Sequence, residues 1–226
     1  VTNNYVSFAN EMWRIVAVNP DNTIRLVLNY SSAHGNYNQR TDSIDYTGLS
    51  YTFEGEESSD ILTYLNGWYK TKLEDRGFDK YITTASYCND STTTKKGYNK
   101  YYYGAYERLV EAKNPSIICQ VSSNDFGGEY NLKIGLLSAD EVAIAGGVYN
   151  INNNSYYLYN GDGFYTMSGA EFTNSTAYIF SVTNGGAIAE SELNSNLGIR
   201  PVINIDSSIT ASGTGTIDDP YVLDLE

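Results

Sequence analysis

Alternating apolar and polar positions dominate the start of the chain. Residues 5–8, 12–18 and 24–28 are rich in β-branched and aromatic side chains, and turn-forming residues separate them at positions 9–10 and 19–22. Strands joined by such short turns usually pair with their neighbours in sequence. The pattern therefore predicts a three-stranded antiparallel meander.

A three- and four-residue apolar period replaces this alternation after a polar stretch, residues 30–57, which we interpret as an extended surface segment. Ser58 or Ser59 can cap a helix here, and Gly77 would end it. The periodic positions are Ile61, Leu62, Leu65, Trp68, Tyr69 and Leu73. They predict an amphipathic helix that packs on the sheet with Trp68 at the centre of its apolar face.

The remaining elements follow from shorter signals. Residues 78–120 form a Tyr-rich excursion with a short helix near residues 103–112, and Ser138 with Glu141 forms a capping box for a helix that ends at Gly146. A turn at 218–220 precedes a last strand that can close the sheet against the N-terminal meander. Strands are predicted at 132–137, 164–167, 177–182, 187–189, 199–205 and 221–223.

These elements indicate an α+β fold within one domain, residues 1–226, because no repeat and no linker divides the chain. No apolar run reaches 18 residues, so we expect no membrane insertion by this segment. We expect any export signal or anchor to lie outside it.

The net charge and the composition limit the classes of molecule that the chain is expected to bind. The net charge is -13, from 27 acidic and 14 basic residues, and this argues against nucleic acid because phosphate binding depends on Lys and Arg. The chain has 22 Tyr, against 7 Phe and 2 Trp. Tyr combined with Ser, Gly and Asn is typical of recognition surfaces, although bacterial extracellular β-proteins share this composition without a particular ligand.

Cys88 and Cys119 are the two cysteines. With one histidine and no CxxC pair, the chain cannot assemble a zinc site of the usual Cys/His kind. An even pair in an exported protein favours a disulfide, worth roughly 3–4 kcal/mol in the chain-entropy model. The alternative is two separate buried thiols.

Catalytic patterns are weak. His34 is the only histidine, on a predicted loop, and no Gly-x-Ser-x-Gly elbow accompanies it, so the catalytic alternative is a dyad of His34 with Cys119 or Cys88. Paired carboxylates could in principle hydrolyse glycosides, but the candidates are scattered: Glu54, Glu56, Glu57, Asp60, Glu171, Glu190 and Glu192. We therefore expect no enzymatic activity, no catalytic residue and no cofactor.

Asn160-Gly161-Asp162-Gly163 resembles part of a calcium loop but lacks the spacing of an EF-hand, so we interpret it as a turn and predict no metal. Arg200 stands in an apolar stretch, residues 198–205, that we interpret as one buried strand. An arginine in such a strand must either face solvent or have carboxylate partners, for which Asp140 and Glu141 are the candidates. A structural ion pair is the first interpretation and ligand binding the second.

Several segments together resemble a family of uncharacterised exported proteins of Firmicutes. They are Asn4-Tyr5-Val6-Ser7-Phe8 with Met12-Trp13-Arg14-Ile15-Val16, Ser138-Ala139-Asp140-Glu141-Val142 with Ala145-Gly146-Gly147, Gly198-Ile199-Arg200-Pro201-Val202-Ile203-Asn204 and Pro220-Tyr221-Val222-Leu223. The layout of the C-terminal part is similar to that of C-type-lectin-like folds, including sulfatase-modifying-factor relatives.

The resemblance implies a C-type-lectin-like domain: a twisted, mostly antiparallel sheet that joins both termini, two main helices and long irregular loops. It does not imply catalysis, because the cysteine pair of the formylglycine-generating enzymes near the C-terminal region has no counterpart after Cys119. The calcium-and-sugar motifs of the lectins, Glu-Pro-Asn or Gln-Pro-Asp, are also missing.

We therefore expect a non-enzymatic bacterial cell-surface domain for adhesion, extracellular and anchored by a segment outside this stretch. Its partner would be a glycan or a host or cell-envelope protein. The predicted ligand-binding residues lie in polar loops: Tyr157, Tyr159, Tyr165, Asn174 and Asn194. The alternatives are a structural, pilus-type surface subunit and, more remotely, a cysteine- or carboxylate-based hydrolase.

Overall fold

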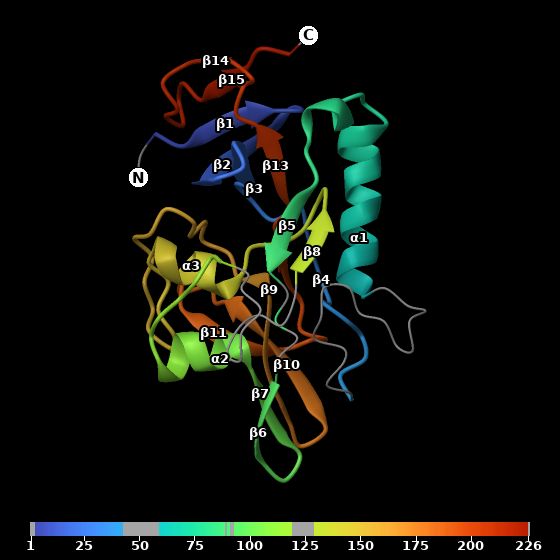
Figure 1. The fold of residues 1–226 in the computed structure, drawn as a ribbon, viewed down its shortest axis with the longest axis vertical. Coiled ribbons are helices and arrows are strands. Elements are labelled where there is room, and N and C mark those ends of the chain that lie inside the picture. Colours follow the sequence, from blue (N-terminus) through green and yellow to red (C-terminus); the bar gives the residue numbers. More distant parts are fainter. Residues whose placement is uncertain (1–2, 43–58, 89, 91–92, 119–128, 226) are drawn as a thin grey trace.

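A computed structural model describes residues 3–42, 59–88, 90, 93–118 and 129–225. The fold is α+β and mostly sheet, as the sequence predicts. Figure 1 shows the two larger sheets one above the other, with the first helix along one side of the molecule. None of the helices in the described part of the chain has the length and apolarity needed to cross a bilayer.

The first sheet contains both ends of the chain. Its first three strands form the predicted antiparallel meander, and the C-terminal strand closes the sheet by pairing parallel to the N-terminal one, with Val6 opposite Tyr221. Its strands, in spatial order, are β13 (Val202–Asp206), β3 (Thr23–Leu28), β2 (Glu11–Val18), β1 (Tyr5–Phe8), β15 (Tyr221–Leu223) and β14 (Ala211–Ser212).

The second sheet is built around the long strand β9 (Phe164–Thr173). In spatial order it contains β11 (Ile188–Glu192), β10 (Thr176–Val182), β9, β12 (Leu197–Ile199) and β4 (Ala33–Gly35), and the hairpin β6 (Thr93–Gly97) and β7 (Lys100–Tyr103) also pairs with β9. His34 therefore lies in a strand, opposite Gly198, and its predicted position on a loop is wrong. A separate ribbon joins β5 (Ala85–Cys88) to β8 (Glu129–Leu132).

Residues 198–205 do not form the single predicted strand. The stretch divides at Arg200-Pro201, so that β12 belongs to the second sheet and β13 to the first. Proline has no N–H with which to continue a ladder, although its carbonyl oxygen still accepts a hydrogen bond from Leu28 N at 2.9 Å. Arg200 therefore lies where the chain crosses from one sheet to the other.

Both predicted caps are present. Helix α1 (Asp60–Tyr69) continues into a π-helical turn η2 (Lys70–Glu74), and Ser59 accepts a hydrogen bond from Leu62 N at 3.2 Å. Trp68 packs edge-on against Trp13, with ring centroids 6.0 Å apart, so α1 covers one face of the first sheet. Helix α3 (Ala139–Ala145) begins with the Ser138–Glu141 capping box and ends at Gly146, where φ is 120°.

Helix α2 (Gly104–Tyr106) continues into a π-helical turn, η4 (Glu107–Glu111), and together they confirm the predicted helix near residues 103–112. A short 3-10 turn, η3 (Asp79–Tyr81), precedes β5. The strand predicted at 132–137 is wrong in its position: β8 ends at Leu132, and Gly135 contributes only an isolated bridge to Val202. One cluster of buried apolar side chains runs through α1 and both sheets, including Leu65, Leu26 and Phe164.

Candidate functional site

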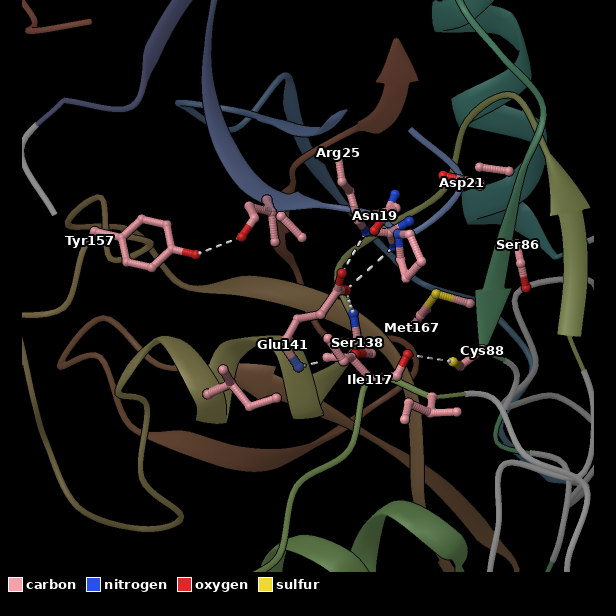
Figure 2. A pocket seen from close by; sticks show the side chains of 16 residues that line it. Asn19, Asp21, Arg25, Ser86, Cys88, Ile117, Ser138, Glu141, Tyr157 and Met167 are labelled. Atoms are coloured by element: carbon pink, nitrogen blue, oxygen red, sulfur yellow. Dashed lines mark hydrogen bonds and ion pairs between the residues drawn. The ribbon is translucent and has the colours of Figure 1, made fainter. Parts of the chain in front are cut away.

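A pocket of about 480 Å³ opens between the first sheet, strand β5, residues 117–118 and helix α3 (Figure 2). Its volume lies in the range that binds small ligands or a few side chains. The walls are mainly aliphatic: Val16, Ala17, Ile117, Ile118, Ile144 and Met167. The geometry of the pocket follows from the sheet, because residues on the face of β2 and β3 away from α1 point towards α3.

The ion pair of Arg25 with Glu141 forms one polar part of the pocket wall. Arg25 Nε lies 2.5 Å from Glu141 Oε1, and Arg25 Nη2 also donates to Leu136 O at 3.3 Å. Glu141 Oε2 accepts the capping hydrogen bond from Ser138 N at 2.7 Å. The guanidinium carbon of Arg25 lies 4.2 Å from the centre of the Tyr87 ring. The pair joins α3 to β3, and the hydrogen bonds of both side chains are formed with other groups of the protein.

Tyr157 closes one end of the pocket. Its hydroxyl group donates to the carbonyl oxygen of Val16 at 3.2 Å, which fixes the ring against β2 (Figure 2). Burial raises the pKa of this hydroxyl group, so Tyr157 remains a hydrogen-bond donor at neutral pH. Of the predicted ligand-binding residues, Tyr157 is the one that the structure places in this pocket.

Three isoleucines give the pocket an exposed aliphatic rim. Ile117, Ile118 and Ile144 are 56%, 59% and 55% exposed. Asn19 and Asp21, in the turn between β2 and β3, also line the pocket. Asp21 Oδ1 accepts hydrogen bonds from the backbone and the hydroxyl group of Thr23, so the turn is well fixed. The rim therefore combines aliphatic side chains with one carboxylate.

A buried cluster of charges holds the isoleucine segment in place. Arg108 Nε and Nη2 each lie 2.9 Å from an oxygen of Asp140, and Nη2 is also 2.9 Å from Asp90 Oδ1. Ser116 N donates to Asp140 Oδ1 at 2.8 Å, directly before the two isoleucines. Asp140 thus connects η4, α3 and the pocket rim. Burial raises the pKa of Asp90 to about 7, despite the nearby Arg108.

We expect the Asp90→Asn substitution to change how stability depends on pH. The pKa of Asp90 rises from 3.8 to about 7 on folding, so between these values the folded chain keeps a proton that the unfolded chain releases. The carboxyl group of Asp90 therefore lowers stability as pH rises through this window. Asparagine, which cannot ionise, removes that loss.

Urea unfolding of the original protein and of D90N at about pH 5 and about pH 8 measures this effect. Relative to the original protein, D90N should be more stable at the higher pH than at the lower pH. An equal difference between the two proteins at both pH values would contradict the prediction.

The structure places His34 beside Asp162 and not in the pocket that Cys88 lines, and Cys119 lies outside the described residues. His34 Nε2 lies 2.8 Å from Asp162 Oδ2, and Ser31 Oγ donates to the same oxygen at 2.6 Å. A serine activated for attack would instead donate to the histidine. Cys88 lines the pocket, whose described lining does not include His34.

Cys88 contacts the end of the described segment that precedes Cys119. Its Sγ is 3.9 Å from the carbonyl oxygen of Ile117, two residues before Cys119, and Cys88 is not a free thiol. Cys119 lies outside the described residues. The disulfide therefore stays a prediction.

The other polar motifs are turns. Asp162 N donates to Asn160 Oδ1 at 3.1 Å, and Thr214 N donates to Asp219 Oδ2 at 3.0 Å. In the part of the chain that the structure describes, no group of three or more His, Cys, Asp or Glu side chains is placed to hold a metal ion.

The remaining predicted binding residues do not form one surface. Tyr165 is 1% exposed, packs edge-on against Tyr37 and donates to the carbonyl oxygen of Ser195, so it is a core residue and its predicted contact with a ligand is wrong. Tyr159 donates to Asn184 O at 2.8 Å. Asn174 is exposed at the turn between β9 and β10, and Asn194 is exposed between β11 and β12.

The predicted carboxylate partners of Arg200 are also wrong. Arg200 Nε donates to Leu28 O at 3.0 Å, Nη1 donates to Leu158 O at 2.6 Å, and the guanidinium carbon lies 4.6 Å from the centre of the Phe164 ring. Asp140 pairs with Arg108 and Glu141 with Arg25. Among the described residues Arg200 has no ion pair, and burial lowers its pKa to about 9.

Sequence reasoning missed the pocket because its walls come from segments far apart in the chain. Arg25 and Glu141, for example, are 116 positions apart. A signal did exist: Arg25 alternates with apolar residues in a predicted strand, and such an arginine requires a partner. Comparisons with protein-family models, curated proteins and solved structures find no match for the chain.

Proposed function

We propose that this chain is a non-enzymatic bacterial cell-surface domain that binds a protein partner, and that the pocket receives an aliphatic side chain of that partner. The observation that carries the proposal is the aliphatic pocket with three exposed isoleucines on its rim. Exposed aliphatic side chains around a cavity are typical of interaction sites, because water contact there costs free energy that a partner can recover.

The chemistry of the walls favours a protein over a glycan. A sugar presents hydroxyl groups that need free polar partners and a ring face that packs on an aromatic side chain. Here the guanidinium and carboxylate groups of Arg25 and Glu141 bond to each other, and Tyr157 donates to Val16 O. Asn19, Asp21 and Ser138 also line the pocket, and each forms a hydrogen bond within the protein. Most of the remaining lining is aliphatic, and it suits a leucine, isoleucine or valine side chain.

Charge adds a second requirement on the partner. Arg25 and Glu141 compensate each other, so Asp21 leaves the rim negative, in a chain whose net charge is -13. Electrostatic complementarity therefore favours a segment with Lys or Arg next to its aliphatic side chain.

The C-type-lectin-like architecture, the Firmicutes family and the extracellular location belong to the same proposal. A mainly antiparallel sheet that contains both the first and the last strand of the described chain supports the fold assignment. The combination of Tyr with Asn, Ser and Gly supports the location.

Selection from a phage-displayed peptide library, with a glycan array in parallel, tests the function. We expect enriched peptides to combine an aliphatic residue with Lys or Arg. Ile144→Asp should weaken binding of such a peptide by about tenfold or more, because it places a charge at the aliphatic rim.

Ile217→Asp is the matched control. Ile217 is 57% exposed, close to the 55% of Ile144, but does not line the pocket. I217D should bind the selected peptide like the original protein. Binding that I144D leaves unchanged, or binding to glycans alone, would overturn the proposal.

A further inference from the structure

Arg14 is a buried arginine on the face of the first sheet opposite α1. It follows Trp13 in strand β2, so its side chain points away from α1, and it is 7% exposed. Its guanidinium carbon lies 3.9 Å from the centre of the Tyr5 ring and 5.9 Å from that of Tyr157. Tyr5 is its cross-strand neighbour in β1. The guanidinium is therefore positioned by aromatic rings.

Arg14 has no anionic partner among the described residues, unlike Arg25, which pairs with Glu141, and Arg108, which pairs with Asp90 and Asp140. Its Nε is buried without a hydrogen-bond partner. A buried charge is costly unless it is paired, and this chain has 27 acidic residues from which a partner could come. Arg14 is therefore a candidate group for binding an anionic ligand.

A second buried cation strengthens the positive potential beside Arg14. Arg200 is 1% exposed and donates only to carbonyl oxygens, and the charge of Arg14 contributes to lowering its pKa. Residues 156–158 contact both arginines, through the Tyr157 ring and Leu158 O. In the same segment the hydroxyl group of Tyr156 is buried without a hydrogen-bond partner. Donors and positive charge thus gather here in an acidic protein.

We propose that Arg14, whose guanidinium lies over the Tyr5 ring with Tyr157 nearby, binds an oxyanion group of a ligand, a carboxylate or a phosphate. A guanidinium stacked on aromatic rings keeps its N–H groups in one plane, where they can donate two parallel hydrogen bonds to such a group. Nε is closed to solvent, so the anion would bind at Nη1 and Nη2, which are not among the buried atoms without a partner. This site adjoins the aliphatic pocket and shares Tyr157 with it, but the described lining of the pocket does not include Arg14, and anion binding does not depend on the proposed peptide binding.

Titration of isotope-labelled protein with sodium phosphate, and separately with sodium acetate, tests the site. Sodium chloride keeps the ionic strength constant, and the Nε–H resonance of Arg14 reports binding. We expect a saturable shift of this resonance below about 50 mM anion and a matching rise in melting temperature. The anion that saturates first shows whether a phosphate or a carboxylate is preferred.

Arg14→Lys keeps the charge but removes the planar donor pair, and it should weaken anion binding by about tenfold. Arg76→Lys is the control, because Arg76 also packs near a ring, 5.5 Å from the centre of Phe78, but donates to Ala9 O. R76K should bind the anion like the original protein. An Arg14 resonance that neither anion shifts saturably, or equal anion affinity in R14K, would overturn the proposal.

Discussion

Replacing Asp140 with asparagine is expected to lower the free energy of unfolding by about 3–5 kcal/mol. Asp140 is fully buried and accepts hydrogen bonds from Arg108 Nε and Nη2, each at 2.9 Å, and from Ser116 N at 2.8 Å. Asparagine cannot accept both bonds from the guanidinium and removes the charge that balances it. Urea unfolding monitored by tryptophan fluorescence measures the loss.

Asp75→Asn is the matched control for D140N. Asp75 also pairs with a cation, Lys70 Nζ at 2.8 Å, but both side chains are exposed. Water and salt screen such a pair, so its removal should cost far less stability than the removal of the buried carboxylate of Asp140. Similar losses of stability in D140N and D75N would contradict a role for the buried cluster in holding η4, α3 and the pocket rim together.

Elements with strong local signals could be predicted from the sequence. The meander rests on β-branched runs between turns, α1 on its apolar period and Ser59, and α3 on the Ser138–Glu141 capping box. The hairpin of β6 and β7 was missed because β6 reads Thr-Thr-Lys-Lys-Gly, a mostly exposed edge strand without apolar alternation. Its pairing with β9 depends on neighbours that the local sequence does not specify.

The candidate site was less predictable because composition says which side chains suit binding but not where they point. Tyr157 and Tyr165 look alike in the sequence, yet one lines the pocket and the other lies in the core. The ion pairs are equally non-local. Arg108 pairs with Asp140 and Arg25 pairs with Glu141, so neither carboxylate is left to pair with Arg200. These assignments depend on how the two sheets pack.

Arg200→Met is expected to lower the free energy of unfolding by about 2–4 kcal/mol. The substitution removes the donors that bond to Leu28 O and Leu158 O, and it leaves both buried carbonyl groups one hydrogen bond short. Hydrogen bonds from a charged donor contribute about 1.5–3 kcal/mol each. Part of this loss is offset, because methionine also removes a buried charge whose desolvation lowers the pKa of the arginine.

Arg200→Lys separates these two contributions, because lysine keeps the charge but not the planar group that reaches the carbonyl oxygens of Leu28, in β3, and Leu158. We expect R200K to be no more stable than R200M in urea unfolding. If R200M matched the original protein, the cost of the buried charge would equal the strength of its two hydrogen bonds. Full stability in R200K but not in R200M would show that the positive charge, and not the shape of the guanidinium, holds the crossing between the sheets. The Phe164 ring, whose centre lies 4.6 Å from the guanidinium carbon, could stabilise either cation.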